Sequence, residues 1–449
     1  MQRPSWIAHA RSATSVGCLA LGLALGVFVA ATGPSLARLW TGLTHDGGTP
    51  GPGAAGMAAA SPASWIATWA ASPEAASDGR SERGFDDRTV RDVIYTSAGG
   101  TAVRVRISNR YGTRPLHVGA ASMGTVLDGA ALVPAPARPL AFGKNGKRSV
   151  TIPAGHSVTS DPVSYAVPPL AELAVSLYLP DPTGPVTWHS LAQQASYVAG
   201  GDHADGRRGA PYGVTEHSWY FLTEVDVRSP SRYGTIVAFG DSITDGLGSH
   251  AGADDRWPNF LARRLRAALG DRAPGVVDEG ISGNRVLSDC VGPSALRRFS
   301  TDALGITGVR AVILLEGIND ISHATGLPGQ CASRSSRDVT ASAIEDGYRR
   351  LIALARARGV TVYLGTLTPA PDLTRAGQAM REAVNRWITA SSAAGISGGV
   401  ADFAGAVADA GHPAYLNPAC NSGDDLHPND LGYDLMAQVV PLAWGRSAG

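Results

Sequence analysis

The pattern of apolar and polar positions changes once along the chain, near residue 230. Before that point, runs such as AVRVRISN set Val103, Val105 and Ile107 against arginines, the two-residue period of a half-buried strand. Similar short runs recur, separated by turn residues, and no helical period of useful length interrupts them. Residues 64–229 are therefore predicted to form an all-β sandwich that is jelly-roll-like.

From residue 233 onward, strands that are apolar nearly throughout alternate with helical stretches. The strands are read from GTIVAFG, VVDEG, VRAVILLEG, VTVYLGTL and GVADF. Helices are predicted over 257–269, 339–358, 377–394 and 431–444. This alternation is typical of an α/β fold whose parallel sheet is covered on both faces, which we place at residues 233–447. In such sheets the ligand sites lie at the carboxyl ends of the strands.

The N-terminus resembles an export sequence. Arg3 and Arg11 precede an apolar run over residues 16–31, and small residues follow at the −3 and −1 positions of a cleavage site after Ala37. We expect residues 1–37 to be a signal peptide and the protein to be secreted or periplasmic. The alternative is an uncleaved membrane anchor, for which this run is short. A flexible linker rich in Gly, Ala and Pro is predicted over 38–63.

Length and charge limit the class of protein. A chain of 449 residues exceeds one ordinary core, so two folded domains are the default expectation. The 38 basic residues equal the 38 acidic ones, so no basic face is expected and nucleic acid is not expected as a partner.

The cysteines beyond the N-terminal segment do not have the spacing of a metal site. In an exported chain they can form a disulfide. Cys290 and Cys331 both lie in loop-like sequence and are the favoured pair, with Cys420 as the free thiol. The sequence leaves this pairing open.

The stretch IVAFGDSITDGLGS ends an apolar run at Ser242. A serine hydroxyl becomes a useful nucleophile only when a base takes its proton. Near the C-terminus, DDLHPND puts Asp424 three residues before His427, so that the carboxylate can reach one imidazole nitrogen and leave the other basic. Taken alone, the first motif is more often a turn, and the second also suits a capped helix with an ordinary surface histidine.

Two further motifs, EGISGN and EGIND, also end apolar runs. A backbone amide at Gly283 and the carboxamide of Asn319 are donors of the kind that stabilise an oxyanion. For either motif alone, a tight turn at the end of a strand is the favoured interpretation.

Taken together, the four motifs resemble the SGNH hydrolases, also called GDSL-type esterases and lipases, over about residues 233–444. The resemblance implies a flavodoxin-like α/β/α sandwich and no metal or organic cofactor. It assigns Ser242 as nucleophile, His427 as base and Asp424 as the acid, because Asp425 is only two residues from the histidine. The implied oxyanion hole is the N–H of Ser242, the N–H of Gly283 and the side chain of Asn319, and Asp241 is a supporting candidate.

The expected activity is hydrolysis of carboxylic esters through an acyl-enzyme, on short-chain or acetyl groups of a small molecule or polysaccharide. Acyl transfer by the same site, a lipase on longer chains, and a carbohydrate-binding protein with an inert hydrolase domain are the alternatives. Residues 322–338 and 368–378 are expected to shape the acyl pocket. A membrane is a partner only if the N-terminal segment is uncleaved, and the oligomeric state is not predicted.

The β region more weakly resembles the N-terminal sandwich of a bacterial subset of these hydrolases, in its layout and in the stretch TWHSLAQQASYVAGGD. Such a sandwich can bind sugars, cover the active site or stabilise its partner. Trp188 and His189 either face the cleft or pack at the edge of the sandwich, and packing is the favoured interpretation.

Overall fold

The protein is represented by a computed structural model that describes residues 63–441, except 136, 144 and 325–338. The predicted signal peptide and nearly all of the predicted linker lie outside the described residues. No helix within the described ranges is both long and apolar enough to cross a membrane. The described residues all belong to one compact unit, and the predicted domain boundaries stay a prediction.

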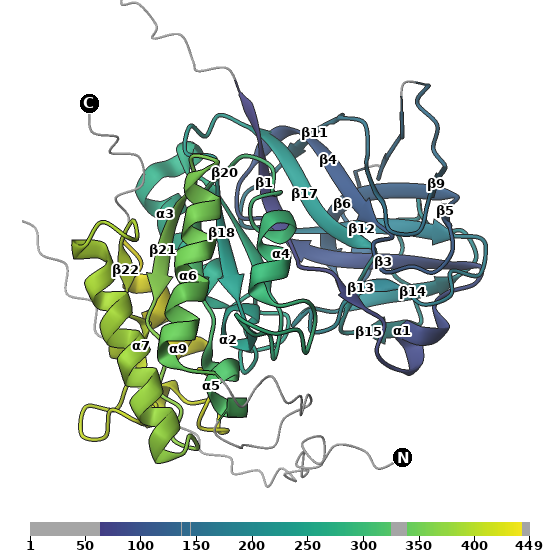
Figure 1. The fold of residues 1–449 in the computed structure, drawn as a ribbon. Coiled ribbons are helices and arrows are strands. Elements are labelled where there is room, and N and C mark those ends of the chain that lie inside the picture. Colours follow the sequence, from purple (N-terminus) through teal and green to yellow (C-terminus); the bar gives the residue numbers. More distant parts are fainter. Residues whose placement is uncertain (1–62, 136, 144, 325–338, 442–449) are drawn as a thin grey trace, which may run out of the picture. The chain divides into compact units, whose positions relative to one another are not determined.

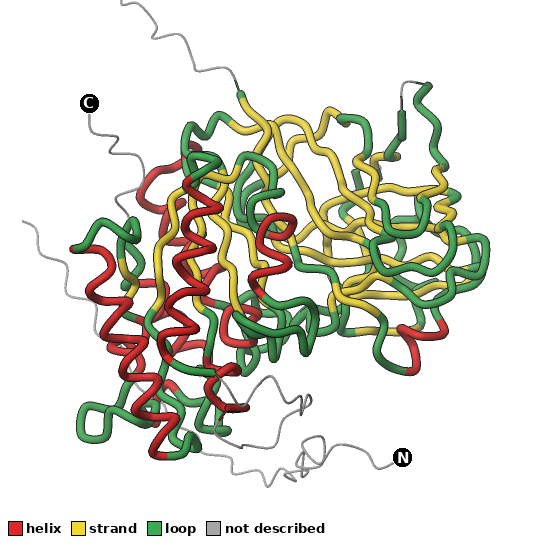
Figure 2. The backbone as a smooth tube through the Cα atoms, in the orientation of Figure 1, coloured by secondary structure: helices red, strands yellow, loops and turns green. Residues whose placement is uncertain are grey.

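The region before residue 230 is built from antiparallel sheets (Figure 1), and Figure 2 shows that strands and loops make up most of it. One sheet has the order β1 (Ser64–Ala70), β17 (Leu222–Ser229), β4 (Gly100–Ser108) and β10 (Ser157–Thr159), and β11 (Val163–Val167) also pairs with β4. A second sheet has the order β15 (Val214–Glu216), β14 (Ser196–Gly200), β3 (Arg88–Tyr95), β12 (Glu172–Leu179), β6 (Ala120–Asp128) and β7 (Ala131–Leu132), with β8 (Arg138–Pro139) paired to β6. Smaller sheets are β16 (Trp219–Tyr220), β13 (Thr187–His189) and β2 (Glu74–Ala75), and β5 (Leu116–Val118) with β9 (Val150–Ile152).

The two larger sheets face one another across a shared apolar core. Val103, Val105 and Ile107 of β4 are completely buried, and they cluster with Val175 and Leu177 of β12 in the other sheet. The alternation in the sequence thus predicted both the strand and its buried face, and the β-sandwich is confirmed. A five-residue helix, α1 (Gly79–Arg83), was not predicted, because one capped turn is too short to show a period.

The second region has a five-stranded parallel sheet. Its order is β19 (Gly275–Gly280), β18 (Thr235–Gly240), β20 (Val309–Leu315), β21 (Thr361–Gly365) and β22 (Val400–Ala401). Numbered by their order in this region, the strands run 2-1-3-4-5, the flavodoxin-like doubly wound order. Every residue of β18 is buried, because β18 lies inside the sheet and both faces of the sheet are covered.

Helices form two groups around this sheet, and Figure 1 shows α6 and α7 in front of it. The first group contains α4 (Ala295–Asp302), α5 (Ile318–Ala324), α6 (Ala341–Arg356) and α7 (Arg375–Ala393). The second contains α3 (Trp257–Leu269), α8 (Phe403–Val407) and α9 (Asp430–Gln438), while α2 (Ser242–Asp245) follows β18. Short 3-10 turns cover Gly270–Arg272 and Pro418–Cys420. The predicted flavodoxin-like α/β/α fold is confirmed.

The helix predictions vary in accuracy. The predicted bounds of α3 are correct, and those of α6 and α7 differ from the structure by one to two residues at each end. The last helix was predicted through residue 444, but α9 ends at Gln438 and Val439 is its C-cap. The short helices α2, α4, α5 and α8 were not predicted.

The β region packs directly against the parallel sheet. Ala67 and Ala70 of β1 belong to the same buried cluster as the core of that sheet. Polar contacts join them as well: the Ala67 N–H donates to Oγ1 of Thr235 at 3.0 Å, and the Val276 N–H donates to Oγ of Ser97 at 2.9 Å. We call this contact surface between residues 63–229 and 233–441 the seam.

Candidate active site

Ser242 is the first residue of α2, immediately beyond the carboxyl end of β18. Asp241 is the N-cap of that helix, and its carboxylate accepts the Ile243 N–H at 3.0 Å. Burial raises the pKa of Asp241 to about 7, against the opposing effects of this hydrogen bond and of His427. The strand therefore stops at a serine because a capped turn of helix begins there, and this turn holds the hydroxyl at the edge of the sheet.

His427 lies between Ser242 and Asp424. Its Nε2 is 2.8 Å from Ser242 Oγ, and its Nδ1 is 2.6 Å from Asp424 Oδ2. Ser242 and His427 are only 6% and 7% exposed, so water has little access to the bond between them. This chain of contacts allows the imidazole to take the serine proton while the carboxylate holds the ring.

The loop before His427 explains why Asp424 rather than Asp425 makes this contact. Oδ1 of Asp424 accepts the backbone N–H groups of Leu426 and His427 at 3.0 and 2.8 Å, which leaves Oδ2 for the ring. Burial raises the pKa of Asp424, but the hydrogen bonds from His427 and Leu426 outweigh it and hold the pKa below its usual range. Asp425 has a positive φ of 63° and accepts instead from Asn421 Nδ2 at 2.5 Å.

Gly283 and Asn319 follow the two strands that flank β18. Gly240 of β18 is in register with Gly280 of β19 and Leu315 of β20, so all three chains leave the sheet at one edge. Gly283 has a φ of 83°, a conformation that favours glycine, and an added Cβ would lie 3.0 Å from the Val291 side chain.

Asn319 is held by the neighbouring loop. Its Nδ2 donates to the carbonyl of Asn284 at 3.0 Å, which fixes the carboxamide and uses one of its two hydrogens. The next residue, Asp320, accepts the N–H groups of Val286 and Leu287 at 2.7 and 3.0 Å. Burial raises the pKa of Asp320 to about 6. Sequence reasoning missed these supports, although Asn284 and Asp320 stand beside the predicted residues in their motifs.

Arg298 of α4 was also missed, and it joins several of the strand ends. It is completely buried, and its guanidinium lies 3.9 Å from the centre of the Phe239 ring. It donates to the carbonyls of Gly240 and Glu279, each at 2.8 Å, and to Asn284 Oδ1 at 2.9 Å. One cation thus fixes the ends of β18 and β19 and the loop that orients Asn319.

The two aromatic candidates of the β region have different positions. Trp188 is buried, and its Nε1 donates to the Ala75 carbonyl at 3.1 Å, which fits packing within the β region. His189 is also buried but reaches across the seam, with its Nε2 3.0 Å from Asp245 Oδ1 of α2.

The cysteine prediction is only partly within the described residues. Cys290 is disulfide-bonded, but Cys331 lies outside the described residues, so their pairing stays a prediction. Cys420 is a buried free thiol. Among the described residues, no group of three or more His, Cys, Asp or Glu side chains could hold a metal ion.

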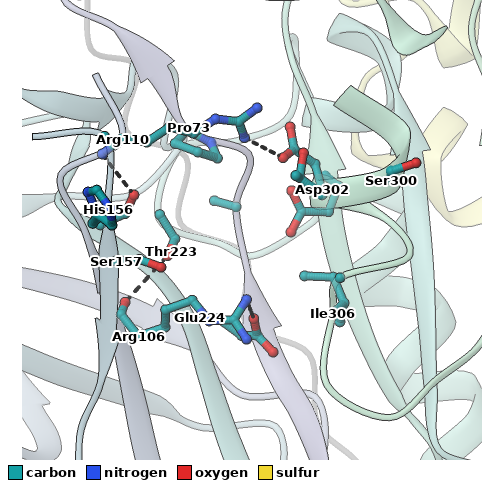
Figure 3. Close-up of a pocket in the computed structure, with 16 residues that line it drawn as sticks. Pro73, Arg106, Arg110, His156, Ser157, Thr223, Glu224, Ser300, Asp302 and Ile306 are labelled. Carbon is teal, nitrogen blue, oxygen red and sulfur yellow. Dashed lines mark hydrogen bonds and ion pairs between the residues drawn. The ribbon is translucent and has the colours of Figure 1, made fainter. Parts of the chain in front are cut away.

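A cavity of about 390 Å³ lies at the seam, and Figure 3 shows the residues that line it. Ion pairs Arg110–Asp302 and Arg106–Glu224 lie along its walls, at 2.6 and 2.5 Å. Neither Ser242 nor the residues in contact with it line this cavity, so we do not assign the reacting group to it.

A second cavity, of about 480 Å³, reaches Asp425, the neighbour of Asp424. Its lining includes Tyr415, which is half exposed, together with His412 and Asn421. Polar groups and one exposed aromatic ring therefore lie close in sequence to the Ser–His–Asp cluster.

Comparisons with known proteins give one family match and several similar solved structures. The model of the GDSL-like lipase/acylhydrolase family matches residues 238–435. A comparison with curated proteins gives no match. Among solved structures, the chain is similar to LAE5, an alpha/beta hydrolase enzyme from the metagenome of Lake Arreo, Spain, at 24% identity and a TM-score of 0.36, covering 46% of this chain and 92% of that one.

Two other similar structures are a GDSL-like lipase from Bacteroides thetaiotaomicron and a variant of Axe2, an acetyl xylan esterase from Geobacillus stearothermophilus. Each is 20% identical over 46% of this chain, covering 86% and 91% of the other chain, with TM-scores of 0.33 and 0.35.

Proposed function

Since residues 238–435 belong to the GDSL-like lipase and acylhydrolase family and the chain is a carboxylic ester hydrolase, we propose that it cleaves short-chain, chiefly acetyl, esters of saccharides outside the cytoplasm. The observation that carries the proposed site is the contact of His427 with both Ser242 Oγ and Asp424 Oδ2, at 2.8 and 2.6 Å. Export rests on the N-terminal segment 1–37.

In the proposed reaction, Asp424 holds the proton on Nδ1 of His427, so that Nε2 is the base. Nε2 takes the proton from Ser242 Oγ as the oxygen attacks the ester carbonyl. The negative charge that develops on the carbonyl oxygen is stabilised by the N–H groups of Ser242 and Gly283 and by Nδ2 of Asn319.

The tetrahedral intermediate then collapses. The bond to the alcohol oxygen breaks, the alcohol takes the proton from Nε2, and the acyl group stays on Ser242. Water repeats the sequence in reverse: His427 takes its proton, the water oxygen attacks the acyl carbon, and Ser242 recovers its hydrogen as the carboxylic acid leaves.

The saccharide part of the proposal is supported by the cavity at Asp425. A sugar presents hydroxyl groups that can donate to carboxylates and apolar C–H faces that can lie on an aromatic ring. The half-exposed Tyr415 and the polar groups of Asp425 and Asn421 supply both kinds of contact. A cavity for a long acyl chain would instead be lined mainly by apolar side chains.

The experiment compares p-nitrophenyl esters of increasing acyl length with acetylated xylan and acetylated pectin, with released acid measured. Ser242→Ala is expected to abolish turnover while leaving the unfolding midpoint unchanged. If that variant keeps a near-normal rate, the nucleophile is wrong. If octanoate or longer esters are cleaved faster than acetate, the short-chain proposal is wrong.

A second variant tests the saccharide. Tyr415→Ala is expected to lower kcat/KM on acetylated xylan about tenfold, because it removes one aromatic contact worth roughly 1.4 kcal/mol. The same variant is expected to leave p-nitrophenyl acetate hydrolysis unchanged. Equal effects on both substrates, or on neither, would contradict a saccharide contact at this cavity.

A further inference from the structure

His189 connects the β region to the helix that carries Ser242. Its Nδ1 lies 2.9 Å from the Ser72 carbonyl, and its Nε2 lies 3.0 Å from Asp245 Oδ1 and 3.2 Å from the Leu191 carbonyl. Carbonyl oxygens only accept hydrogen bonds, and an ionised carboxylate does the same, so both ring nitrogens have to donate. The contacts therefore select the doubly protonated imidazolium.

Asp245 also forms hydrogen bonds to the loop that contains Gly283. Its second oxygen, Oδ2, accepts the N–H of Ser282 at 3.2 Å and the hydroxyl of Ser282 at 2.9 Å. The backbone leaves no room for adjustment, because a Cβ added at Gly280 would lie 2.4 Å from the backbone nitrogen of Asp245. One carboxylate is thus bonded to His189 through one oxygen and to Ser282, the residue before Gly283, through the other.

The surroundings favour the charged ring. His189 and Asp245 are 3% and 2% exposed, so the attraction between them is little screened by water. The other titratable groups near the ring are Glu74 of β2 and Asp278 of β19. The ring of Trp219 lies beside that of His189, tilted by 31° with the ring centres 5.4 Å apart, and the Arg256 guanidinium is 5.3 Å from the centre of the Trp219 ring.

Burial by itself lowers the pKa of His189, but the charge and hydrogen bond of Asp245, with Glu74, raise the pKa to about 9. The imidazolium is therefore present over the neutral range. If Nε2 lost its proton, its lone pair would face the oxygens of Asp245 and Leu191, and the hydrogen bonds to them would be lost.

We propose that His189 is a positioning residue of the hydrolase site, which holds Asp245 and through it Ser282, so that the N–H of the next residue, Gly283, keeps the orientation that an oxyanion requires. The β region is then part of the catalytic apparatus, in addition to any contact that it makes with substrate. This inference rests on the proposed roles of Ser242 and Gly283.

The test measures kcat and KM for p-nitrophenyl acetate with wild type, His189→Gln and Ser282→Ala. His189→Gln is expected to lower kcat about 10- to 100-fold, less than the roughly 100- to 1,000-fold cost of losing an oxyanion donor outright, with KM within about twofold. Ser282→Ala keeps the backbone bond to Asp245 and is expected to lower kcat about threefold to tenfold.

The pH profile separates positioning from simple packing. In the wild type, kcat is expected to fall between about pH 8 and 10 as the ring loses its proton, and this fall is expected to be absent from His189→Gln. The double variant is expected to lose little more than His189→Gln alone, because both changes act through one chain of contacts.

His117→Gln is the matched control. His117 also pairs with an aspartate, Asp181, at 2.7 Å, but both side chains are exposed, so kcat is expected to stay within about twofold of wild type. The inference is overturned if His189→Gln keeps wild-type kcat and pH profile, whether or not its unfolding midpoint falls.

Ser242→Ala is measured alongside to separate the two proposals. If this variant still turns over substrate, the proposed function itself is wrong. If His189→Gln does not fold, Ser282→Ala becomes the deciding variant. An unchanged kcat in Ser282→Ala then overturns the inference.

Discussion

Arg298→Met tests whether one buried cation holds the strand ends of the site together. Asn284 Oδ1 loses its donor, which costs roughly 1–3 kcal/mol of unfolding free energy for a buried acceptor. The carbonyls of Gly240 and Glu279 keep second partners, the Ile281 N–H and the Ser72 hydroxyl, so each is expected to lose only about 1 kcal/mol.

Together these three losses come to about 3–5 kcal/mol of unfolding free energy. Glu316, 3.6 Å from the guanidinium, loses its counter-charge. Burial raises the pKa of Glu316 well above its usual range, so that this carboxyl can stay protonated and the loss is limited. Because Arg298 also fixes the loop that orients Asn319, kcat is expected to fall as well.

The measurement is urea unfolding at equilibrium, with the free energy extrapolated to water. Arg297→Met is the matched control, because Arg297 precedes Arg298 in the same helix, its side chain is 67% exposed, and its ion pair with Asp289 lies at the surface. The control is expected to change the unfolding free energy by less than about 0.5 kcal/mol. A loss below about 1 kcal/mol for Arg298→Met, or equal losses for the two variants, would refute the reasoning.

Asp424→Asn is expected to lower kcat about 1,000- to 10,000-fold at nearly constant KM, since an amide no longer selects the productive imidazole tautomer; a loss below about tenfold would contradict the assignment. Asn319→Ala is expected to lower kcat about 100- to 1,000-fold, and an unchanged kcat would exclude this side chain from the oxyanion hole. Stability is expected to fall from pH 5 to 9. Burial raises the pKa of Asp278 to about 7. Burial lowers the pKa of His189, but the nearby carboxylates outweigh it and raise that pKa to about 9. The folded state therefore binds more protons than the unfolded state, at Asp278 up to about pH 7 and at His189 from its usual value of 6.5 to about pH 9, so unfolding midpoints in urea that rise with pH would contradict the sign.

The α/β fold and the candidate cluster could be predicted because both depend on local pattern and on sheet geometry. Apolar runs marked β18, β19 and β20, and the polar residues that follow each run were the candidates. Parallel strands in register send their carboxyl ends to one edge, so Ser242, Gly283 and Asn319 could be placed near one another without coordinates. The three-residue spacing in DDLHP similarly predicted the contact of Asp424 with His427.

The supporting residues could not be predicted, because their role depends on which face of an element is covered. Arg297 and Arg298 are identical neighbours in sequence, yet one side chain is mostly exposed and the other is completely buried. Helix α4 is only eight residues long, and the face that it buries carries Arg298 and Asp302 beside Ala295 and Phe299, so apolar character alone did not mark that face. Only the packing of α4 against the ends of β18 and β19 determines which of the two arginines is buried.

The role of His189 could not be predicted either, because its partner lies far away in the sequence. The sequence offered two interpretations, facing a cleft or packing at an edge, and both treated the residue as belonging to the β region alone. The contact with Asp245 joins residues 56 positions apart and requires the seam between the two regions. No periodicity in either region could have indicated it.

The polar character of the seam follows from the position of the site. Asp245, Glu279 and Arg298 are buried beside the strand ends, where each would be costly without a partner. The β region supplies those partners: His189 bonds to Asp245, and the hydroxyl of Ser72 contacts Glu279 Oε2 at 2.5 Å and accepts from Arg298 at 2.9 Å. Asp245, Glu279 and Arg298 thus each take one hydrogen-bond partner from the β region in addition to those within the α/β region, so we expect the strand ends to be fully satisfied only when both regions are folded together.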